Sequence, residues 1–287
     1  MKYINDFLNY LEFERRLSGH TVRSYKNDLL DYYEFHGTLA TDVDSVRAYQ
    51  KHLSDEKYGN STILRKISSL RSFFKYLTFR GIIKSNPMIV ISNPKKEKLL
   101  PNYLNYDNLE KLLNAPNTKT DIGKRDALIL ELLYSSGIRV SELVNIKLKD
   151  INSDEKTILI HGKGNKERYT YYGSKCESLM GDYIRTVRSK LTSSEYLLAN
   201  KHGGHLNDRV IRMIVQNYTK ISGINVHVSP HTLRHTYATH MLNGGADLKS
   251  VGDLLGHENL STTQIYTHVS NERLRHIYLN AHPRAKH

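Results

Sequence analysis

Between residues 136 and 269, four short segments carry side chains suited to chemistry at a phosphodiester: SGIRVSEL, HGKGNKER, HTLRHTYATHML and LLGHENLSTTQIYTHV. A phosphodiester under attack gains negative charge on its non-bridging oxygens. Guanidinium and imidazole groups stabilise that charge through charge-assisted hydrogen bonds. We therefore take six residues as candidate catalytic residues: Arg139, Lys163, His231, Arg234, His257 and Tyr266.

Each residue of this set has a chemical role in such a reaction. The ordinary pKa of a tyrosine is about 10, so a phenol nucleophile such as Tyr266 needs a nearby base and a positive field. The arginines and histidines can provide both. A leaving 5′-hydroxyl needs a proton, which Lys163 in a hairpin turn can deliver.

Taken one at a time, the same residues have plainer interpretations. Arg139 follows a glycine that ends a helix and can form a surface ion pair with Glu142. A lysine in a turn is usually an ordinary surface residue, and Tyr266 is one of 20 tyrosines. Only the combination predicts a single chemistry.

Metal and nucleotide sites are the alternatives for two of the segments. His231 and His235 have the i, i+4 spacing of a metal pair, but Thr232 stands where an H-E-x-x-H motif has glutamate. The GKG turn lacks the spacing of a phosphate-binding P-loop. We expect no metal and no cofactor.

Size and composition set the class of protein. A chain of 287 residues is long enough for two domains, since a domain has about 150 residues. Hydrophobic residues make up 39% and charged residues 25%, as in folded globular proteins. The lone Cys176 excludes an intrachain disulfide, and no signal peptide or membrane span is recognisable. These features predict a cytoplasmic protein.

The charge is strongly basic and unevenly distributed. Lys and Arg number 42 against 29 Asp and Glu, a net charge of +13. Residues 57–98 hold 10 basic side chains and one acidic, for a net charge of +9. Such a surplus indicates nucleic acid, an anionic membrane or a merely solvated face.

The first ninety residues have apolar side chains at helical spacing in four segments. Thr21 is a candidate N-cap of the second helix, and Gly81 follows the end of the fourth. In the fourth helix, apolar residues occupy one face, and Arg65, Arg71 and Lys75 lie in a separate arc. The segments are 4–11, 22–33, 43–53 and 60–80.

A change of pattern follows the first helices. Pro87, Pro94 and Pro101 surround a lysine cluster and indicate an extended linker. Farther on, KTILIHGKGNKERYTYYG alternates apolar and polar residues around a Gly-rich turn, which predicts a β-hairpin. Helical patterns surround it, with an end at Gly137 and breaks at Gly244, Gly245 and Gly256. The fold class is mainly α (α+β), with a small antiparallel hairpin or sheet.

Long segments resemble the tyrosine site-specific recombinases, and among them the Xer-type recombinases. SGHTVRSYKNDLLDYYEF is similar to the core-binding signature, and SGIRVSEL to the first arginine box. HTLRHTYATHMLNGGADLKSVGDLLGHENLSTTQIYTHV is similar to the second box, and NERLRHIYLNAHPRA to the Xer-type C-terminus. The resemblance implies a helical SAM-like core-binding domain over 1–85, a linker over 86–103 and a catalytic domain over 104–287.

The resemblance also implies the mechanism. Tyr266 would form a 3′-phosphotyrosyl bond and release a 5′-hydroxyl, without ATP or metal. Lys163 would be the general acid, and His231 the acid/base for Tyr266. Together with His231, the residues that stabilise the transition state would be Arg139, Arg234 and His257.

Double-stranded DNA is the partner that the resemblance implies. Two duplexes would be held by a homo-tetramer, or by a hetero-tetramer with a sister recombinase, and a DNA translocase is a possible activator. The last helix, around 271–282, would dock on a neighbouring subunit. Candidate DNA contacts are Arg65, Arg71, Lys75, Arg209 and Arg212. For Arg65, a phosphate contact without sequence reading, or a solvated side chain, explains the residue as well as base recognition does.

Three catalytic functions remain as alternatives, together with a DNA-binding role without catalysis. Resolution of chromosome or plasmid dimers is the expected task, and integration or excision of a mobile element is the second. A topoisomerase with the same phosphotyrosine chemistry is the third. A DNA-binding architectural protein without turnover would have no need of the six candidate catalytic residues.

Overall fold

The computed structural model describes residues 1–92, 103–162, 167–190, 194–200, 202, 204–256 and 268–285. The chain divides into two compact units, Met1–Leu99 and Leu100–His287. Both are mainly helical, and the second also contains a small antiparallel sheet. The expected fold class is thus confirmed. No helix within the described ranges is long and apolar enough to cross a membrane.

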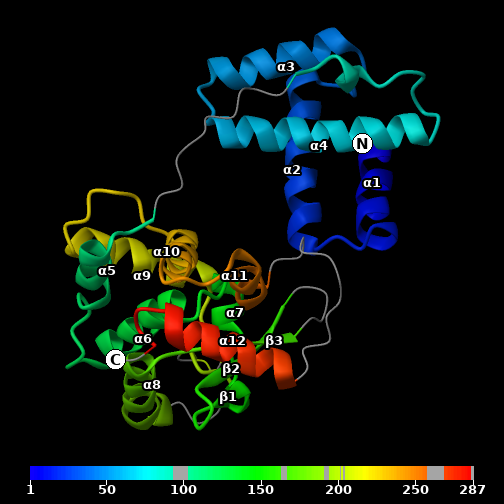
Figure 1. Cartoon of the computed structure of the whole chain (residues 1–287). Coiled ribbons are helices and arrows are strands. Elements are labelled where there is room, and N and C mark those ends of the chain that lie inside the picture. The colour runs from blue at the N-terminus through cyan, green and yellow to red at the C-terminus, as the bar shows by residue number, and fades with distance from the viewer. Residues whose placement is uncertain are drawn as a thin grey trace. The chain divides into compact units, whose positions relative to one another are not determined.

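The described part of the first unit contains the four α-helices that the apolar spacing predicted. Figure 1 shows α1 and α2 side by side, with α3 and α4 crossing them. A π-helical turn extends α1, so that Ile4, Phe7 and Leu11 all reach the core. The helices are α1 (Lys2–Asn9), α2 (Gly19–His36), α3 (Val43–Asp55) and α4 (Asn60–Phe79).

Two details of the first unit differ from the expectations. The hydroxyl of Ser18, not Thr21, caps α2, accepting the backbone N–H of Thr21 at 3.3 Å. Met88 and Ile91 are buried in the core of this unit, whereas the sequence analysis assigned them to the linker. The remainder of that linker, 93–102, lies outside the described residues. Gly81 follows α4 with a φ of +69°, as its stop signal predicted.

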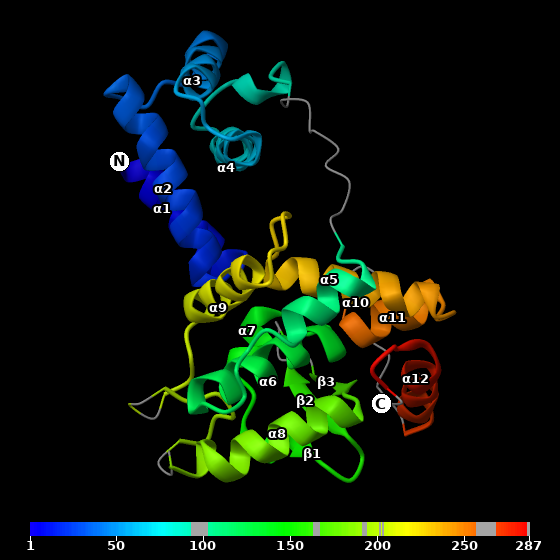
Figure 2. The same cartoon turned by 90° about the vertical axis from the view of Figure 1, so that its left-hand side faces the viewer.

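The second unit is built around the buried helix α6 (Asp121–Ser135), which carries apolar residues on every side. It packs against α8 (Ser174–Thr186) and, elsewhere on its surface, against α9 (Asp208–Ile221) and α10 (Pro230–Asn243). In Figure 2 these last two helices run above α6 and α8 runs below it. The short helix α5 (Tyr106–Leu113) also contacts α6.

The predicted hairpin is part of a three-stranded antiparallel sheet in the order β1-β2-β3. The strands are β1 (Ile151–Asn152), β2 (Thr157–His161) and β3 (Glu167–Tyr171). β3 contacts α11 (Leu248–Leu255) and α12 (His268–Ala281). The sheet thus brings the hairpin close to the last two helices.

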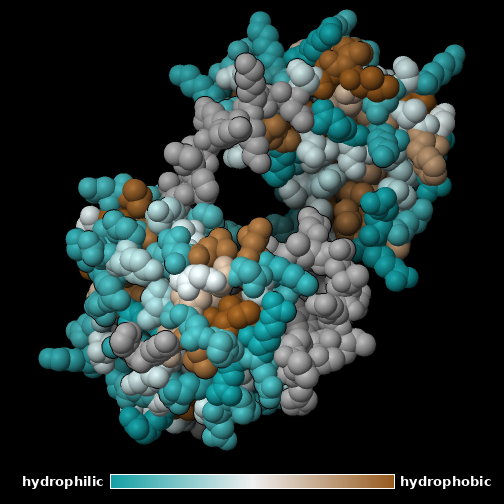
Figure 3. Space-filling view, in the orientation of Figure 1, coloured by the Kyte–Doolittle hydropathy of each residue, from teal (hydrophilic) through white to brown (hydrophobic). Residues whose placement is uncertain are grey.

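The last helix packs on its own chain. Tyr278 is 1% exposed and stacks on Tyr171 of β3, with ring centroids 5.8 Å apart. The hydroxyl of Tyr171 donates a hydrogen bond to the carbonyl of Asn271 at 2.7 Å. Leu279, by contrast, is exposed on this helix. Figure 3 shows that the visible surface of both units is mainly hydrophilic.

Candidate active site

The sharp connection between α6 and the short helix α7 (Val140–Val144) places the first candidate arginine. Gly137 has a φ of +59°, in the left-handed region that favours glycine. A Cβ atom there would lie 2.6 Å from Cδ1 of Tyr237 and 2.9 Å from Cδ2 of Leu255. Glycine is therefore required by both conformation and space, and Arg139 follows at the N-cap of α7.

Arg139 is held mainly by Glu142. The carboxylate of Glu142 accepts the backbone N–H of Arg139 at 2.8 Å and its guanidinium Nη1 at 2.8 Å. The ion pair considered in the sequence analysis is therefore present, but it is no ordinary surface pair. Glu142 has only 5% of its side chain exposed, whereas Arg139 retains 38%. The Arg139 side chain therefore remains accessible to a ligand.

Arg234 enters the same region from α10. Its side chain is buried, and Nη1 donates to the carbonyl of Gly137 at 2.6 Å, while Nη2 donates to that of Leu255 at 2.6 Å. Burial, and then the charge of Arg139, lowers the pKa of Arg234 to about 10. This pKa is far above neutrality, so Arg234 is a cation at pH 7.

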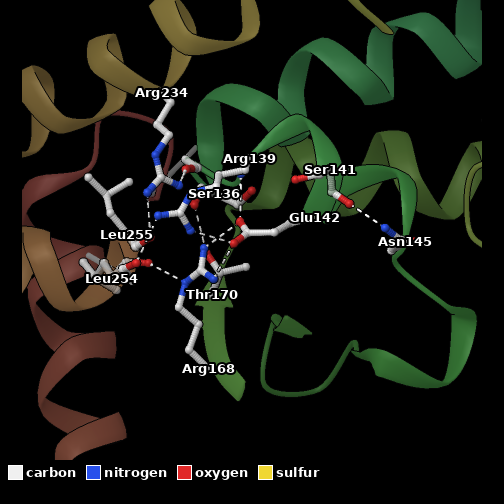
Figure 4. Close-up of polar contacts among 12 residues, drawn as sticks. Ser136, Arg139, Ser141, Glu142, Asn145, Arg168, Thr170, Arg234, Leu254 and Leu255 are labelled. Carbon is white, nitrogen blue, oxygen red and sulfur yellow. Dashed lines mark hydrogen bonds and ion pairs between the residues drawn. The ribbon is translucent and has the colours of Figure 1, made fainter. Parts of the chain in front are cut away.

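The last carbonyls of α11 each accept a hydrogen bond from a different arginine (Figure 4). Arg168 of β3 donates Nε to Leu254 at 3.2 Å, and Arg139 donates Nη2 to Gly256 at 3.1 Å. Carbonyls at a helix C-terminus lack partners within the helix and attract cations. Arg139 and Arg234 are therefore brought together at this helix end.

Glu142 joins Arg139 to Arg168. The guanidinium of Arg168 binds both carboxylate oxygens, with Nη1–Oε1 and Nη2–Oε2 distances of 3.0 and 2.9 Å (Figure 4). Burial alone would raise the pKa of Glu142, but its bonds with Arg168 and Arg139 outweigh burial and lower this pKa. Three arginines and one carboxylate leave a net charge of +2 on this cluster, which we call the arginine cluster: Arg139, Arg168, Arg234 and Glu142.

His231 lies in the first turn of α10, where Ser229 caps the helix and Pro230 occupies the first position. His231 is exposed at the surface, but partial desolvation of its ring, together with the positive charges of Arg212, Arg234 and Arg139, lowers its pKa. The imidazole is therefore neutral at pH 7 and can accept a proton. His231 lies three residues before Arg234 on α10, and the charges of Arg139 and Arg234 act on its ring.

The remaining candidate catalytic residues are Lys163, His257 and Tyr266, and all three lie outside the described residues. Their neighbours along the chain are described. In the sequence, Lys163 lies between β2 and β3, and His257 directly follows Gly256, whose carbonyl Arg139 binds. Within the described ranges, no group of three or more histidine, cysteine or acidic side chains could hold a metal ion.

The predicted DNA contacts of the first unit lie on α4, but two of them have partners within that unit. Arg65 forms an ion pair with Asp28 of α2 and donates to the hydroxyl of Ser24 at 3.3 Å. Arg71 donates Nη2 to the carbonyl of Ile91 at 3.0 Å. Lys75 is exposed.

The predicted DNA contacts of the second unit lie on the exposed face of α9. Arg209 is exposed, and Arg212 forms a weak ion pair with Asp208, with an Nη2–Oδ2 distance of 3.7 Å. Arg212 also acts on the pKa of His231, as described above. One of the two arginines is thus electrostatically coupled to a candidate catalytic residue.

Arg168 and the bridging position of Glu142 were missed by the sequence reasoning. The alternation of β3 contained a signal for Arg168, because Arg168 and Thr170 occupy one face of the strand and are 6% and 0% exposed. A charged residue at an inward-facing strand position needs a partner of opposite charge. No sequence pattern identified Glu142 as that partner.

Comparison with known proteins identifies the family of this chain. The model described as "Phage integrase family" matches residues 102–273, and "Phage integrase, N-terminal SAM-like domain" matches residues 4–81. The chain belongs to the phage integrase family. Members compared below are named recombinases, and the chain is a DNA breakage-and-rejoining enzyme of the tyrosine recombinase type.

Similar proteins extend over almost the whole chain. "Tyrosine recombinase XerC" of Oceanobacillus iheyensis is 42% identical, over 99% of this chain and 96% of that protein. The protein of the same name from Staphylococcus haemolyticus is 43% identical, over 98% and 96%. These matches therefore extend over both units of the chain.

Solved structures support the same fold. XerA recombinase is 28% identical with a TM-score of 0.53, over 99% of each chain. XerH recombinase, in a post-cleavage complex with its difH substrate, is 24% identical with a TM-score of 0.72, over 90% of this chain and 79% of that one. The XerH likeness shows that the fold is that of a DNA recombinase.

Proposed function

We propose that the chain is an Xer-type recombinase that cuts DNA through Tyr266. The phenol attacks the scissile phosphate and forms a 3′-phosphotyrosyl bond, and the 5′-oxygen leaves with a proton from Lys163. Arg139, Arg234 and His257 stabilise the charge of the transition state. Attack by a released 5′-hydroxyl on the phosphotyrosine then reseals a strand and returns the proton, so the bonds balance without ATP.

The net charge of the arginine cluster is the observation that carries this proposal. One carboxylate neutralises only one of three arginines, so a charge of +2 remains for an anion. Preorganised donors of this kind act strongly on charge that develops during a reaction. The hydrogen bonds of Arg139 and Arg234 to the end of α11 fix their positions before substrate binds.

The neutral ring of His231 supplies the base. Its pKa is lowered by partial desolvation and by the neighbouring arginines, so the imidazole is unprotonated at neutral pH. A neutral imidazole can take the proton of a phenol as the phenol attacks. Once protonated, it adds a third cation beside the developing charge.

The biological task that we propose is the resolution of chromosome or plasmid dimers in the cytoplasm. XerC proteins that are 42–43% identical over nearly the full length support this assignment over integration of a mobile element. Solved relatives bind DNA as dimers or tetramers, including lambda integrase at a Holliday junction. A tetramer on two duplexes fits this assignment, and in it the last helix, which packs on its own chain in the structure, would move to a neighbouring subunit. A translocase remains a candidate activator.

DNA binding is proposed for both units. Arg209 and Arg212 are exposed on α9, and the charge of Arg212 lowers the pKa of His231. On α4, Lys75 is exposed for phosphate contact. Arg65 and Arg71 would exchange contacts within the unit for contacts with DNA.

The nucleophile is tested with a nicked DNA substrate. A site is first selected from random-sequence DNA by the full-length protein, and a nick near the cleavage position then traps the covalent adduct. Wild type should form the adduct and Tyr266→Phe should not, while both bind DNA equally. An adduct formed by Tyr266→Phe would refute the assignment.

The general acid is tested by changing the leaving group. Lys163→Ala should cleave slowly when the leaving atom is a 5′-oxygen and recover when it is a sulfur, because a thiolate leaves without a proton. Failure of the sulfur substrate to restore the rate would remove Lys163 from this role. Wild type on both substrates serves as the control, and EDTA should leave all rates unchanged.

A further inference from the structure

Arg168 makes three side-chain hydrogen bonds at the arginine cluster, and the proposed mechanism does not use it. Its side chain is 6% exposed, and its Nη1 and Nη2 both bind Glu142, while Nε binds the carbonyl of Leu254. These three bonds leave this guanidinium facing protein rather than solvent. Arg168 is therefore not suited to contact DNA itself.

The pairing of Glu142 with Arg168 determines how Glu142 interacts with Arg139. Bidentate pairs of arginine and carboxylate combine charge and fixed geometry. While Arg168 binds both oxygens of Glu142, the guanidinium of Arg139 reaches this carboxylate through Nη1 alone, beside the bond from its backbone N–H. Without Arg168, Arg139 alone would neutralise this buried carboxylate, and the net charge carried by Glu142 and its two arginines would fall from +1 to zero.

Arg168 also joins segments that are far apart in the sequence. It lies on β3, five positions after Lys163 in the sequence, and binds α7 through Glu142 and α11 through Leu254. A Cβ atom at Gly256 would lie 3.0 Å from Cδ and Nε of Arg168. The glycine before His257 therefore packs directly on this side chain.

We propose that Arg168 is a positioning residue of the active site. It neutralises Glu142 so that Arg139 keeps its charge for the phosphate, and it holds the end of α11, where the chain continues to His257. This inference rests on the proposed function, because it assigns Arg168 a role in the rate of phosphotyrosine formation.

The first test compares two buried arginines of the same unit. Arg168→Gln should form the Tyr266 adduct about 100-fold more slowly at saturating DNA, the size of effect expected when one donor to the transition state is lost. Arg188→Gln is the matched control, because Arg188 is 3% exposed and binds the carbonyls of Tyr196 and Ser194. It should lower the melting temperature without slowing adduct formation.

The second test distinguishes positioning from packing. If Glu142 captures Arg139 when Arg168 is lost, Glu142→Gln should partly restore the rate of Arg168→Gln. A merely structural role predicts that the double variant is slower than either single variant. Arg168→Lys should retain an intermediate rate, because lysine keeps the charge but cannot bind both oxygens in a fork.

The leaving-group substrate separates this role from that of Lys163. A sulfur leaving group should rescue Lys163→Ala but leave Arg168→Gln slow, because the missing element is positive charge rather than a proton. Gel-shift affinity should be unchanged, and circular dichroism checks each fold. If Arg168→Gln does not fold, the double variant and Arg168→Lys are compared with Glu142→Gln alone.

Several outcomes would overturn the inference. One is a wild-type rate in a folded Arg168→Gln variant, and another is a double variant slower than Arg168→Gln. If wild type forms the Tyr266 adduct in these experiments, such results refute the role of Arg168 alone. A wild type that forms no adduct refutes the proposed function and this inference together.

Discussion

Each unit of the chain contains a cluster of cations around acidic groups, and the two clusters differ in charge. In the first unit, Arg65 and Lys66 of α4 meet Asp28 and Asp31 of α2. Lys66 donates to Asp31 at 2.6 Å, and the hydroxyl of Ser69 donates to Asp28 at 2.7 Å. Two cations and two carboxylates cancel, whereas the arginine cluster of the second unit keeps a charge of +2.

This difference in net charge indicates that the two clusters, although chemically similar, have different functions. We call the group in the first unit the α2–α4 clamp: Arg65, Lys66, Asp28 and Asp31. A neutral, internally paired group joins two helices and contributes to folding. A cluster with surplus positive charge instead carries repulsion within the folded protein, which an anionic ligand relieves. The comparison can be tested by removing one cation from each cluster.

Removing a cation from the arginine cluster should give the largest effect. Arg234→Gln should slow adduct formation by about 10²–10³-fold, because it removes preorganised charge next to the transition state. Because Arg234 is buried, DNA affinity should change little. Single-turnover rates at saturating DNA measure the first effect and gel shifts the second. An affinity loss that accounts for the whole defect would contradict the role assigned to the surplus charge.

Removing a cation from the α2–α4 clamp should affect folding instead. Lys66→Met leaves Asp31 with the hydrogen bond from Tyr49, at 2.5 Å, but without its cation. Asp31 is 39% exposed, so we expect a loss of about 2 kcal/mol in the unfolding free energy of this unit, below the value for a fully buried pair. Hydrogen exchange of α2 and α4 measures this loss.

The control for the clamp is an exposed cation of the same helix. Lys75→Met should change the unfolding free energy by less than about 0.5 kcal/mol. Lys66→Met should form the Tyr266 adduct at the wild-type rate at saturating DNA. A slowed rate there, with an unchanged unfolding free energy, would show that the clamp has a part in catalysis.

The smallest expected effect is on the pKa of His231. A neighbouring cation disfavours the protonated imidazole, so Arg212→Gln should raise this pKa, while Arg209→Gln should not. NMR titration of the histidine in the free protein measures the change. The acidic limb of the rate profile should move to higher pH in the same variant. An unchanged titration would show that Arg212 does not act on His231.

Sequence patterns predicted much of this fold for clear physical reasons. The spacing of apolar residues predicted α1 to α4, and the alternation of apolar and polar residues over 157–171 predicted the hairpin. Both patterns arise because one face of each element is buried. Capping was less predictable, since Ser18 and Thr21 are both good caps and only the structure selects between them.

The site was predicted in part. The residue types and their order along the sequence identified Arg139, His231 and Arg234 as candidates. In the structure, Arg139 and Arg234 both bind the end of α11, and their charges act on His231. Contacts between distant segments, such as Arg168 with Glu142, depend on how β3 packs against α7 and have no local signal. The catalytic roles of all six candidate residues stay predictions, as do the DNA contacts.

The central claim is that the surplus charge of the arginine cluster acts on the transition state. A methylphosphonate at the scissile position replaces one non-bridging oxygen by a methyl group and so removes one negative charge. The measurement is the ratio of adduct rates, wild type to Arg234→Gln, on this substrate and on the ordinary phosphate. We predict that the ratio falls at least about tenfold on the methylphosphonate, because less charge needs stabilisation. An equal ratio on both substrates would contradict the claim.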